Sequence, residues 1–293
     1  MSDGYWELAV PAPDDVAEAL TNFLWELGAL GVIEEQVAGG QPTLRAFFPA
    51  RSEASTLATR VRDYTDGLRA LGFTAPDALR VTALADADWG EAWREHFRPL
   101  PIGTRFLVVP PWESAACEPG RLTLVIEPAR AFGTGHHGST AGCLVQLEKI
   151  VGPGAPASAI DLGTGSGILA IAAARLGVAR VLAVDEDPDA VGAACANAAV
   201  NGVTRQVTCR VADAAGVTGE PVPLVLANLL SSAHLRLAPS YARQVAGDGR
   251  LVLGGLLDAE ATAVEAELGR HGFDGADVTS IEGWTTLALR RTR

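Results

Sequence analysis

The chain has 293 residues, of which 48% are hydrophobic and 20% charged, and its formal net charge is −12. This length suffices for about two domains with buried cores, and the composition excludes an intrinsically disordered chain. Because proteins that bind nucleic acid through phosphate contacts usually carry a basic surface, the acidic balance disfavours general DNA or RNA binding.

The first 85 residues predict a small α+β domain. Alternating apolar residues and turn residues delimit its strands, and a capping residue and Gly72 delimit its second helix. The expected elements are strand 5–10, helix 14–27, strand 31–37, strand 43–48, helix 52–71 with Ser52 as its N-cap, and strand 80–84. This β-α-β-β-α-β order is typical of a ferredoxin-like domain.

Residues 86–101 predict a linker helix. Trp89, Trp93 and Phe97 are spaced by four, which places three aromatic rings on one helical face, and Pro99 and Pro101 end the segment. Such an aromatic face is usually a packing surface.

The remainder, residues 102–293, predicts a second and larger domain. The apolar runs 105–110 and 121–126 predict a hairpin that leads into it. Beyond them we expect strands at 157–162, 180–184, 207–211, 224–228 and 250–253, helices at 167–176, 188–200, 231–245 and 259–271, and a closing hairpin at 277–282 and 284–290. This alternation is typical of a doubly wound α/β sheet of the Rossmann type, in which ligands bind at the carboxyl ends of the strands.

The strongest local signal is a glycine-rich turn between a strand and a helix. Residues 161–167 have the sequence DLGTGSG, in which glycine lets the backbone approach a ligand and the helix start offers free N–H groups. A dinucleotide fingerprint requires G-x-G-x-x-G, but Ile168 stands where the third glycine would fall. The spacing therefore favours a ligand without a pyrophosphate over NAD.

An acidic residue follows where nucleoside-binding α/β folds usually place one. Asp185 ends the second predicted strand of this sheet, and a carboxylate there can accept hydrogen bonds from both ribose hydroxyls. Asp187, which precedes Pro188, is better explained as the N-cap of the next helix. The glycine turn, Asp185 and the strand order together predict an adenosine-type ligand.

These features resemble the class I S-adenosylmethionine-dependent methyltransferases. The fourth strand of the sheet ends in ANLL at 227–230, where that class places its catalytic loop. The resemblance narrows to the ribosomal protein L-eleven methyltransferase family through residues 88–102, 109–113 and 126–140. AFGTGHH at 131–137 is the most specific mark, and because EGW at 282–284 and the N-terminal domain also match, the resemblance covers nearly the whole chain.

The resemblance implies S-adenosylmethionine as the cofactor and places the site residue by residue. The loop from Phe132 to Thr140 is expected to fold over the methionine end of this methyl donor, and Gly138 within it, where the family often has proline, adds flexibility. Asn228 and Leu229 are implied to be the catalytic residues, and no metal is implied. The residues implied to bind the donor are Phe132, Thr134, Gly135, Thr140, Asp161, Gly163, Gly165, Gly167, Asp185 and Asn228.

The two histidines of this segment have several interpretations. His136 and His137 are adjacent, so both cannot face one metal from a helix, and no C-x-x-C or H-E-x-x-H motif accompanies them. A nucleophilic triad through Ser139 lacks a nucleophile-elbow sequence. A role in ordering the donor loop and a purely structural role stay open. Two interpretations of Asp213 also stay open: it approaches the adenine amine of the ligand, or it belongs to a simple surface loop.

The implied reaction is methyl transfer to an amine. A sulfonium is already an activated electrophile, so catalysis needs alignment and a neutral amine. A lysine amine has a reference pKa of about 10.4 and must first lose a proton, and desolvation beside the cationic sulfonium lowers that pKa. The side-chain oxygen of Asn228 and the carbonyl of Leu229 are expected to orient the amine.

The family resemblance implies that the substrate is large-subunit ribosomal protein L-eleven, methylated on lysine side chains and, as a further option, on its N-terminal amine. Residues 1–85 carry 12 Asp and Glu against 6 Arg, which suits a recognition domain for a basic partner or reflects ordinary solubility. The alternatives are a lysine methyltransferase for another protein, such as an electron-transfer flavoprotein, an NAD-binding oxidoreductase, and a non-catalytic adenosine sensor. Ile168 disfavours the oxidoreductase, and the Asn228 loop disfavours the sensor.

The sequence also predicts where the protein works. Residues 1–20 contain acidic residues and no basic n-region, so no signal peptide is expected, and no apolar run approaches the length of about 18 residues that a membrane span needs. The four cysteines form no C-x-x-C pair, which fits a reducing compartment. We expect a cytoplasmic monomer without direct nucleic-acid or membrane contacts.

Overall fold

The computed structural model describes residues 5–13, 16–29, 31–35, 41–49, 52–70, 72–76, 78–84, 98–113, 118–127, 138–152 and 154–292. The chain divides into two compact units, an N-terminal unit of residues 1–97 and a C-terminal unit of residues 98–293. The described residues form one hydrophobic core in the N-terminal unit and two in the C-terminal unit.

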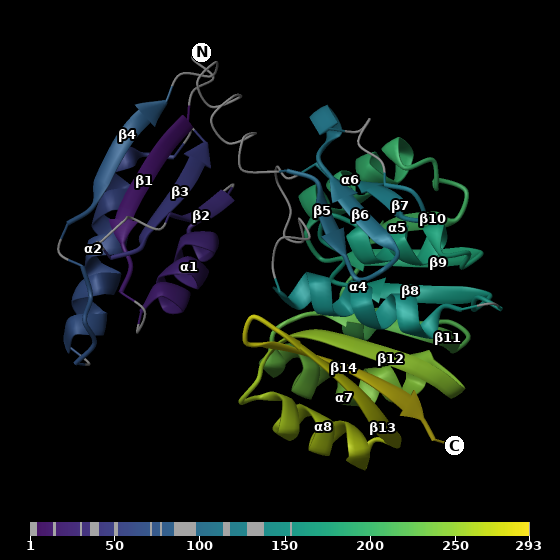
Figure 1. The fold of residues 1–293 in the computed structure, drawn as a ribbon. Helices are drawn as coiled ribbons and strands as arrows, with labels where there is room; N and C mark the ends of the chain where they lie inside the picture. Colours follow the sequence, from purple (N-terminus) through teal and green to yellow (C-terminus); the bar gives the residue numbers. More distant parts are fainter. Residues whose placement is uncertain are drawn as a thin grey trace. The chain divides into compact units, whose positions relative to one another are not determined.

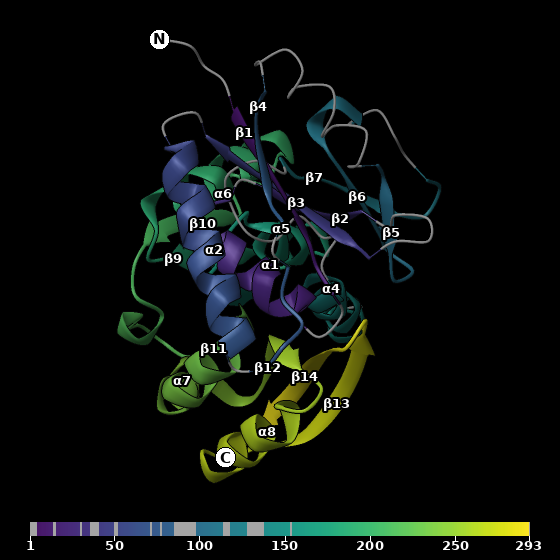
Figure 2. The same cartoon turned by 90° about the vertical axis from the view of Figure 1, so that its left-hand side faces the viewer.

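The N-terminal unit is a four-stranded antiparallel sheet with two helices (Figure 2). Its elements are β1 (Tyr5–Pro11), α1 (Ala17–Glu26), β2 (Gly31–Glu35), β3 (Thr43–Pro49), α2 (Ala54–Ala70) and β4 (Arg80–Leu84). The strands lie in the order β2-β3-β1-β4, and β1 is antiparallel to both of its neighbours. This is the topology of the predicted ferredoxin-like domain.

Both helices pack on the same face of this sheet. Leu20 of α1, Val61 of α2 and Phe48 of β3 belong to one core, and the rings of Phe23 and Tyr64 stack between the helices with centroids 4.0 Å apart. The start of α2 differs from the prediction, because the helix begins at Ala54 and not directly after Ser52.

The C-terminal unit is built on one large sheet (Figure 1). Its strands are β8 (Ser158–Leu162), β9 (Arg180–Asp185), β10 (Val207–Val211), β11 (Val222–Asn228), β12 (Val245–Leu257), β13 (Phe273–Ile281) and β14 (Trp284–Arg291). They lie in the order β10-β9-β8-β11-β12-β14-β13, with β8 to β12 parallel and β14 antiparallel to both neighbours. The predicted doubly wound, Rossmann-like sheet is confirmed, and its strand order reverses between β8 and β11, where such sheets bind ligands.

Helices cover both faces of this sheet (Figure 1). They are α4 (Gly138–Ile150), α5 (Ile168–Arg175), α6 (Pro188–Val200), α7 (Ser231–Gln244) and α8 (Ala261–Arg270). Because successive residues of a strand point to opposite faces, Ala159 lies in the core with α4 and α5, and Ile160 in the core with α7 and α8. Within the described ranges, no helix is both long and apolar enough to cross a lipid bilayer.

A second, three-stranded sheet precedes the large one in the chain. It consists of β5 (Leu100–Ile102), β6 (Phe106–Val109) and β7 (Leu122–Val125). The predicted hairpin between 105–110 and 121–126 is wrong, because β6 and β7 are parallel and the antiparallel pair is β5 with β6. The connection from Pro110 to Arg121 is long enough to return to the other end of β6, as a parallel pair requires.

The linker prediction also needs one correction. β5 begins at Leu100, inside the segment 86–101 that was expected to be helical. Pro101 is tolerated in this strand because β5 is an edge strand of its sheet. Trp89, Trp93 and Phe97 lie outside the described residues.

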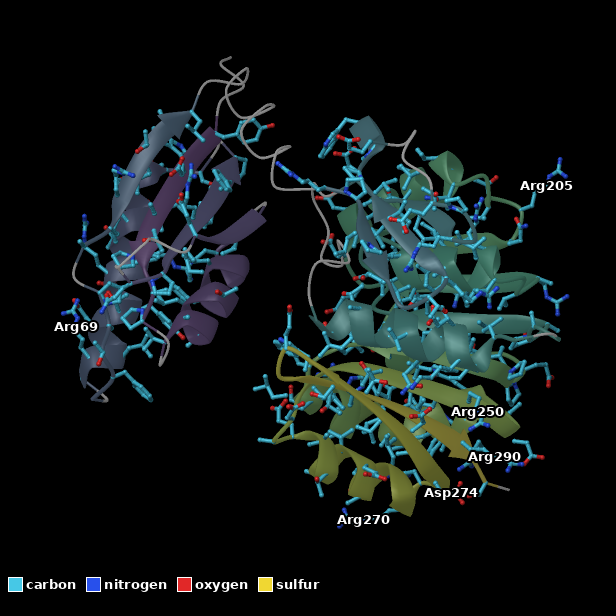
Figure 3. All side chains as sticks on the ribbon, viewed as in Figure 1. Arg69, Arg205, Arg250, Arg270, Asp274 and Arg290 are labelled. Atoms are coloured by element: carbon cyan, nitrogen blue, oxygen red, sulfur yellow. The ribbon has the colours of Figure 1, made fainter. Side chains whose placement is uncertain are left out.

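Different residues lie at the two ends of the parallel strands of the large sheet. Arg250 lies beside Leu224 near the start of β11 and opposite Arg290 of β14, whereas Asn228 ends β11. Arg290 Nη2 also forms an ion pair with Asp248 at 2.8 Å. Arg250 and Arg290, labelled in Figure 3, therefore mark the edge remote from the carboxyl ends of the parallel strands.

Candidate functional site

The glycine-rich turn joins β8 to α5 at the point where the strand order reverses. Gly163, Gly165 and Gly167 have φ angles of 67°, 53° and 82°, which L side chains rarely adopt. A Cβ on Gly163 would collide with Leu229 Cδ2, and one on Gly167 would lie 3.0 Å from Ala194 Cβ. The turn therefore packs against the loop after β11 on one side and against α6 on the other.

Asp161 supports this turn from within β8. It is 1% exposed, and its Oδ2 accepts hydrogen bonds from Thr164 Oγ1 at 2.6 Å and from the Ala170 N–H at 3.1 Å. Burial raises the pKa of Asp161 to about 6 although these two hydrogen bonds oppose the shift, and the Asp185 carboxylate raises it further. Its Oδ1 has no partner among the described residues, so a buried acceptor is available to a ligand.

Asp185 ends β9 beside the same turn. Its Oδ2 accepts from the Gly165 N–H at 2.9 Å, and its Oδ1 accepts from the Asp187 N–H at 3.1 Å. Each carboxylate oxygen has more than one acceptor site, so both can take further donors. The N-cap prediction for Asp187 is confirmed, because its side chain accepts from the Asp189 N–H at 2.9 Å at the start of α6. Asp213 caps a short 3₁₀ turn through the Ala215 N–H at 3.0 Å.

Asn228 ends β11 and meets α4. Its Nδ2 donates to Thr140 Oγ1 at 3.2 Å, so two of the predicted site residues are in contact. In the described part of the chain, Asn228 Oδ1 is buried and has no hydrogen-bond partner. A carboxamide whose nitrogen is held and whose oxygen is uncommitted is suited to accept a hydrogen bond from a bound amine.

The backbone after Asn228 is held by groups that the sequence did not indicate. The Leu229 N–H donates to the Gly254 carbonyl at 3.2 Å, and His234 Nε2 lies 2.8 Å from the same oxygen. A carbonyl only accepts, so Nε2 carries the proton, and Nδ1 accepts from the Tyr241 hydroxyl at 2.9 Å. The Leu229 carbonyl in turn packs against Gly255, where a Cβ would collide with it.

His234 is a neutral support for this loop. Burial lowers its pKa to about 4, against the opposing effect of the Gly254 and Leu229 carbonyls. The ring therefore stays uncharged at neutral pH and keeps one tautomer. Both groups predicted to orient an amine lie against Gly255, where a Cβ would collide with the Leu229 carbonyl and come within 3.1 Å of Asn228 Oδ1. Of the two, Asn228 Oδ1 is a buried acceptor with no hydrogen-bond partner among the described residues.

The carboxyl edge of β8, β9 and β11 thus gathers most of the residues singled out in the sequence. The described members of this site are Thr140, Asp161, Gly163, Gly165, Gly167, Asp185, Asn228 and Leu229. Phe132, Thr134, Gly135, His136 and His137 lie outside the described residues. The arrangement offers acceptors for hydroxyls at Asp185, for a buried donor at Asp161 and for an amine at Asn228.

Comparison with known proteins assigns the chain to a family. Residues 4–292 match the family model for ribosomal protein L11 methyltransferase (PrmA). The ribosomal protein L11 methyltransferase of Geobacter sulfurreducens is 38% identical over 304 residues, which cover 98% of this chain and 99% of that protein. The protein of the same name from Geobacter metallireducens is 36% identical over 299 residues, covering 97% and 98%.

A solved structure agrees with this assignment. The ribosomal protein L11 methylase of Lactobacillus delbrueckii subsp. bulgaricus has a TM-score of 0.62 and 27% sequence identity, and the match covers 67% of this chain and 100% of that one. The sequence match, this structure and the strand order agree: the chain belongs to the ribosomal protein L11 methyltransferase family.

Proposed function

We propose that the protein transfers methyl groups from S-adenosylmethionine to amino groups of ribosomal protein L11, on lysine side chains and on the N-terminal amine. The observation that carries this proposal is the family match along residues 4–292. Asn228 Oδ1, which has no hydrogen-bond partner among the described residues and lies where the strand order reverses, supports the chemistry.

The described residues fit this donor. Asp185 keeps acceptor capacity for the ribose hydroxyls, and Asp161 Oδ1 is a buried, unpartnered acceptor among the described residues that suits the ammonium group of the methionine end. When bound, S-adenosylmethionine supplies a methyl group on a sulfonium, which needs no further activation. Phe132, Thr134 and Gly135 stay predictions for the donor site.

The residues of the chain then have to align the acceptor amine. Asn228 Oδ1 would accept an N–H of the amine and so leave its lone pair free for the methyl group. Leu229 contributes through its side chain, which lies over Gly163, and through its N–H, which fixes the loop on Gly254. Burial of the amine lowers its pKa from the reference value of about 10.4 and favours the neutral nucleophile.

The N-terminal unit is our candidate for substrate recognition. Residues 1–85 carry a net charge of −6, from 12 Asp and Glu against 6 Arg. Complementary charge steers a basic partner towards its site and speeds association. Since ribosomal proteins are made in the cytoplasm, we place the enzyme there as well, and we keep the expectation of a monomer.

The proposal is tested by intact-mass spectrometry of purified ribosomal protein L11 after incubation with the enzyme and S-adenosylmethionine. We expect the mass to rise by whole methyl groups, and the Asn228→Ala variant to bind the donor while its turnover falls by about tenfold or more, which corresponds to about 1.4 kcal/mol in the barrier. Methylation of an electron-transfer flavoprotein but not of ribosomal protein L11 would transfer the proposal to the alternative substrate.

A further inference from the structure

Asn197 of α6 and Asn201, the residue that caps the C-terminus of this helix, form hydrogen bonds far outside the helix. Asn197 and Asn201 are one helical turn apart and are 3% and 7% exposed. A buried amide costs free energy unless its donors and acceptors are paired. The hydrogen-bond partners of these two side chains therefore indicate which parts of the structure each residue stabilises.

The first set of partners lies on the free edge of a strand. β7 is the last strand of the three-stranded sheet, so one of its edges has no neighbouring strand among the described residues. Asn201 Oδ1 accepts from the Val125 N–H at 2.9 Å, and its Nδ2 donates to the Val125 carbonyl at 2.6 Å. Asn197 Oδ1 accepts from the Glu127 N–H at 3.0 Å. The two side chains take the place of a neighbouring strand and fix residues 125–127.

The second partner distinguishes the two asparagines. Asn197 Nδ2 donates to the Ser166 carbonyl at 2.8 Å, inside the glycine turn. Asn201 Nδ2 has its second bond to the Asn197 carbonyl, at the C-terminal end of α6. Only Asn197 therefore joins the strand that leads into residues 128–137 to the turn between β8 and α5.

The hydrogen bond from Asn197 to Ser166 orients the peptide plane between Ser166 and Gly167. Its carbonyl is held by Asn197, and its N–H donates to the Thr164 carbonyl at 2.9 Å. Gly167 has little intrinsic resistance to rotation, so these two bonds help to fix the plane. Ala194, which precedes Asn197 by one helical turn on α6, packs against Gly167, so the same face of α6 contacts the glycine turn at both residues.

We propose that Asn197 is a positioning residue for the methyl donor: it locks the glycine turn in the conformation that binds and ties that turn to the chain segment after β7. The inference rests on the proposed function, because the donor is assigned there to the glycine turn. A turn that is ordered before binding costs less to occupy than one that must be ordered by the ligand.

The test compares variants of the full chain by calorimetry with S-adenosylhomocysteine and by thermal unfolding. Asn197→Ala and Asn201→Ala both remove bonds to residues 125–127, so both should lower the melting temperature. Only Asn197→Ala should weaken S-adenosylhomocysteine binding, by about tenfold or more, which corresponds to about 1.4 kcal/mol. The KM for the donor should rise in parallel, while the KM for ribosomal protein L11 stays at its wild-type value in both variants.

A third variant isolates the bond to Ser166. Asn197→Asp keeps the acceptor for the Glu127 N–H but cannot donate to the Ser166 carbonyl while it is ionised. At neutral pH, Asn197→Asp should bind S-adenosylhomocysteine more weakly than the unchanged protein does. The difference in affinity should shrink as the pH is lowered, because the protonated carboxyl can donate a hydrogen bond. Recovery of the affinity at pH values where the melting temperature does not change separates the positioning role from a purely structural one.

The outcomes separate the two proposals. If the unchanged protein does not bind S-adenosylhomocysteine, the proposed function fails. If it binds, and the Asn197 variants bind as tightly as Asn201→Ala, the positioning role is wrong. Should Asn197→Ala not fold, the pH dependence of Asn197→Asp decides between the two results.

Discussion

Asp185 links the two elements that shape the donor site, because its carboxylate accepts from the Gly165 N–H in the glycine turn and from the Asp187 N–H before α6. Replacing it by Ala removes the acceptors proposed for the ribose hydroxyls. A hydrogen bond to a charged group contributes about 1.5–3 kcal/mol, so we expect Asp185→Ala to weaken S-adenosylmethionine binding by about 10- to 100-fold in calorimetry.

Asp187 provides the matched control for this experiment. It is a neighbouring carboxylate whose side chain caps α6 through the Asp189 N–H. Loss of an N-cap costs about 0.5–2 kcal/mol of stability, so Asp187→Ala should lower the melting temperature and leave donor affinity close to that of the unchanged protein. An equal loss of affinity in both variants would mean that the ribose acceptor is assigned to the wrong residue.

Asp161 gives the protein a predictable dependence of stability on pH. Burial raises its pKa to about 6 in the folded state, against about 3.9 in the unfolded chain. The folded state therefore binds the proton more tightly, and the stabilisation is complete below about pH 4 and lost as the pH rises through about 6.

We expect the free energy of unfolding of the unchanged protein, measured against that of Asp161→Asn, to fall by up to about 3 kcal/mol between pH 4 and 7. Urea titrations across this range provide the measurement. A difference that does not change with pH would show that Asp161 ionises normally and is not desolvated.

At the scale of elements, local signals decide what the sequence predicts well. The span of α6, Pro188–Val200, is predicted to the residue because Asp187 and Pro188 are an unambiguous helix start. β12 is predicted only at 250–253 but extends over Val245–Leu257. Gly254 and Gly255 look like the end of a strand in the sequence, yet they continue it through an irregularity between Leu253 and Leu256.

Some residues of the candidate site can be predicted from the sequence and others cannot. Asp161, Asp185 and Asn228 are predictable because each lies at or near the end of a recognisable strand, and such ends share one edge of the sheet. His234 and Asn197 are not, because their partners are backbone groups 20 and 70 residues away, at Gly254 and Glu127. A backbone carbonyl or N–H leaves no trace in the sequence, so such contacts emerge only from the fold.

The contact between the glycine turn and the loop after β11 is itself testable. Gly163 and Gly202 have nearly the same φ, 67° and 68°, but a Cβ on Gly163 would collide with Leu229, whereas one on Gly202 would meet nothing within 4 Å. Ala at such a φ costs about 1–2 kcal/mol in either place, so both Gly→Ala variants should lose stability, and Gly163→Ala should lose more because of the collision with Leu229.

Only Gly163→Ala should also lose activity, because its Cβ would collide with the side chain of Leu229, the residue next to Asn228. We expect its methylation rate at saturating donor to fall by about tenfold or more, about 1.4 kcal/mol in the barrier, while Gly202→Ala retains the rate of the unchanged protein. Equal methylation rates in the two variants would show that the contact between Gly163 and Leu229 does not affect methyl transfer.

At the scale of the whole molecule, we propose that the two units divide recognition from methyl transfer. The described donor residues all belong to the C-terminal unit, and the acidic residues 1–85 belong to the N-terminal one. A fragment that begins near Asp86 should therefore bind S-adenosylmethionine but fail to methylate ribosomal protein L11.

Circular dichroism must first establish that this fragment is folded, since it starts next to the aromatic residues Trp89 and Trp93. A folded fragment that methylates ribosomal protein L11 as fast as the full chain would disprove the recognition role and leave the acidic domain without an assigned function.

The most direct test of the central claim is to offer the full-length enzyme all large-subunit ribosomal proteins at once, with methyl-labelled S-adenosylmethionine, and to identify the labelled protein by mass spectrometry. The proposed function predicts label on amino groups of ribosomal protein L11, and slower labelling with Asp185→Ala and with Asn228→Ala. Label on a different ribosomal protein, or none on any of them while the donor binds, would contradict it.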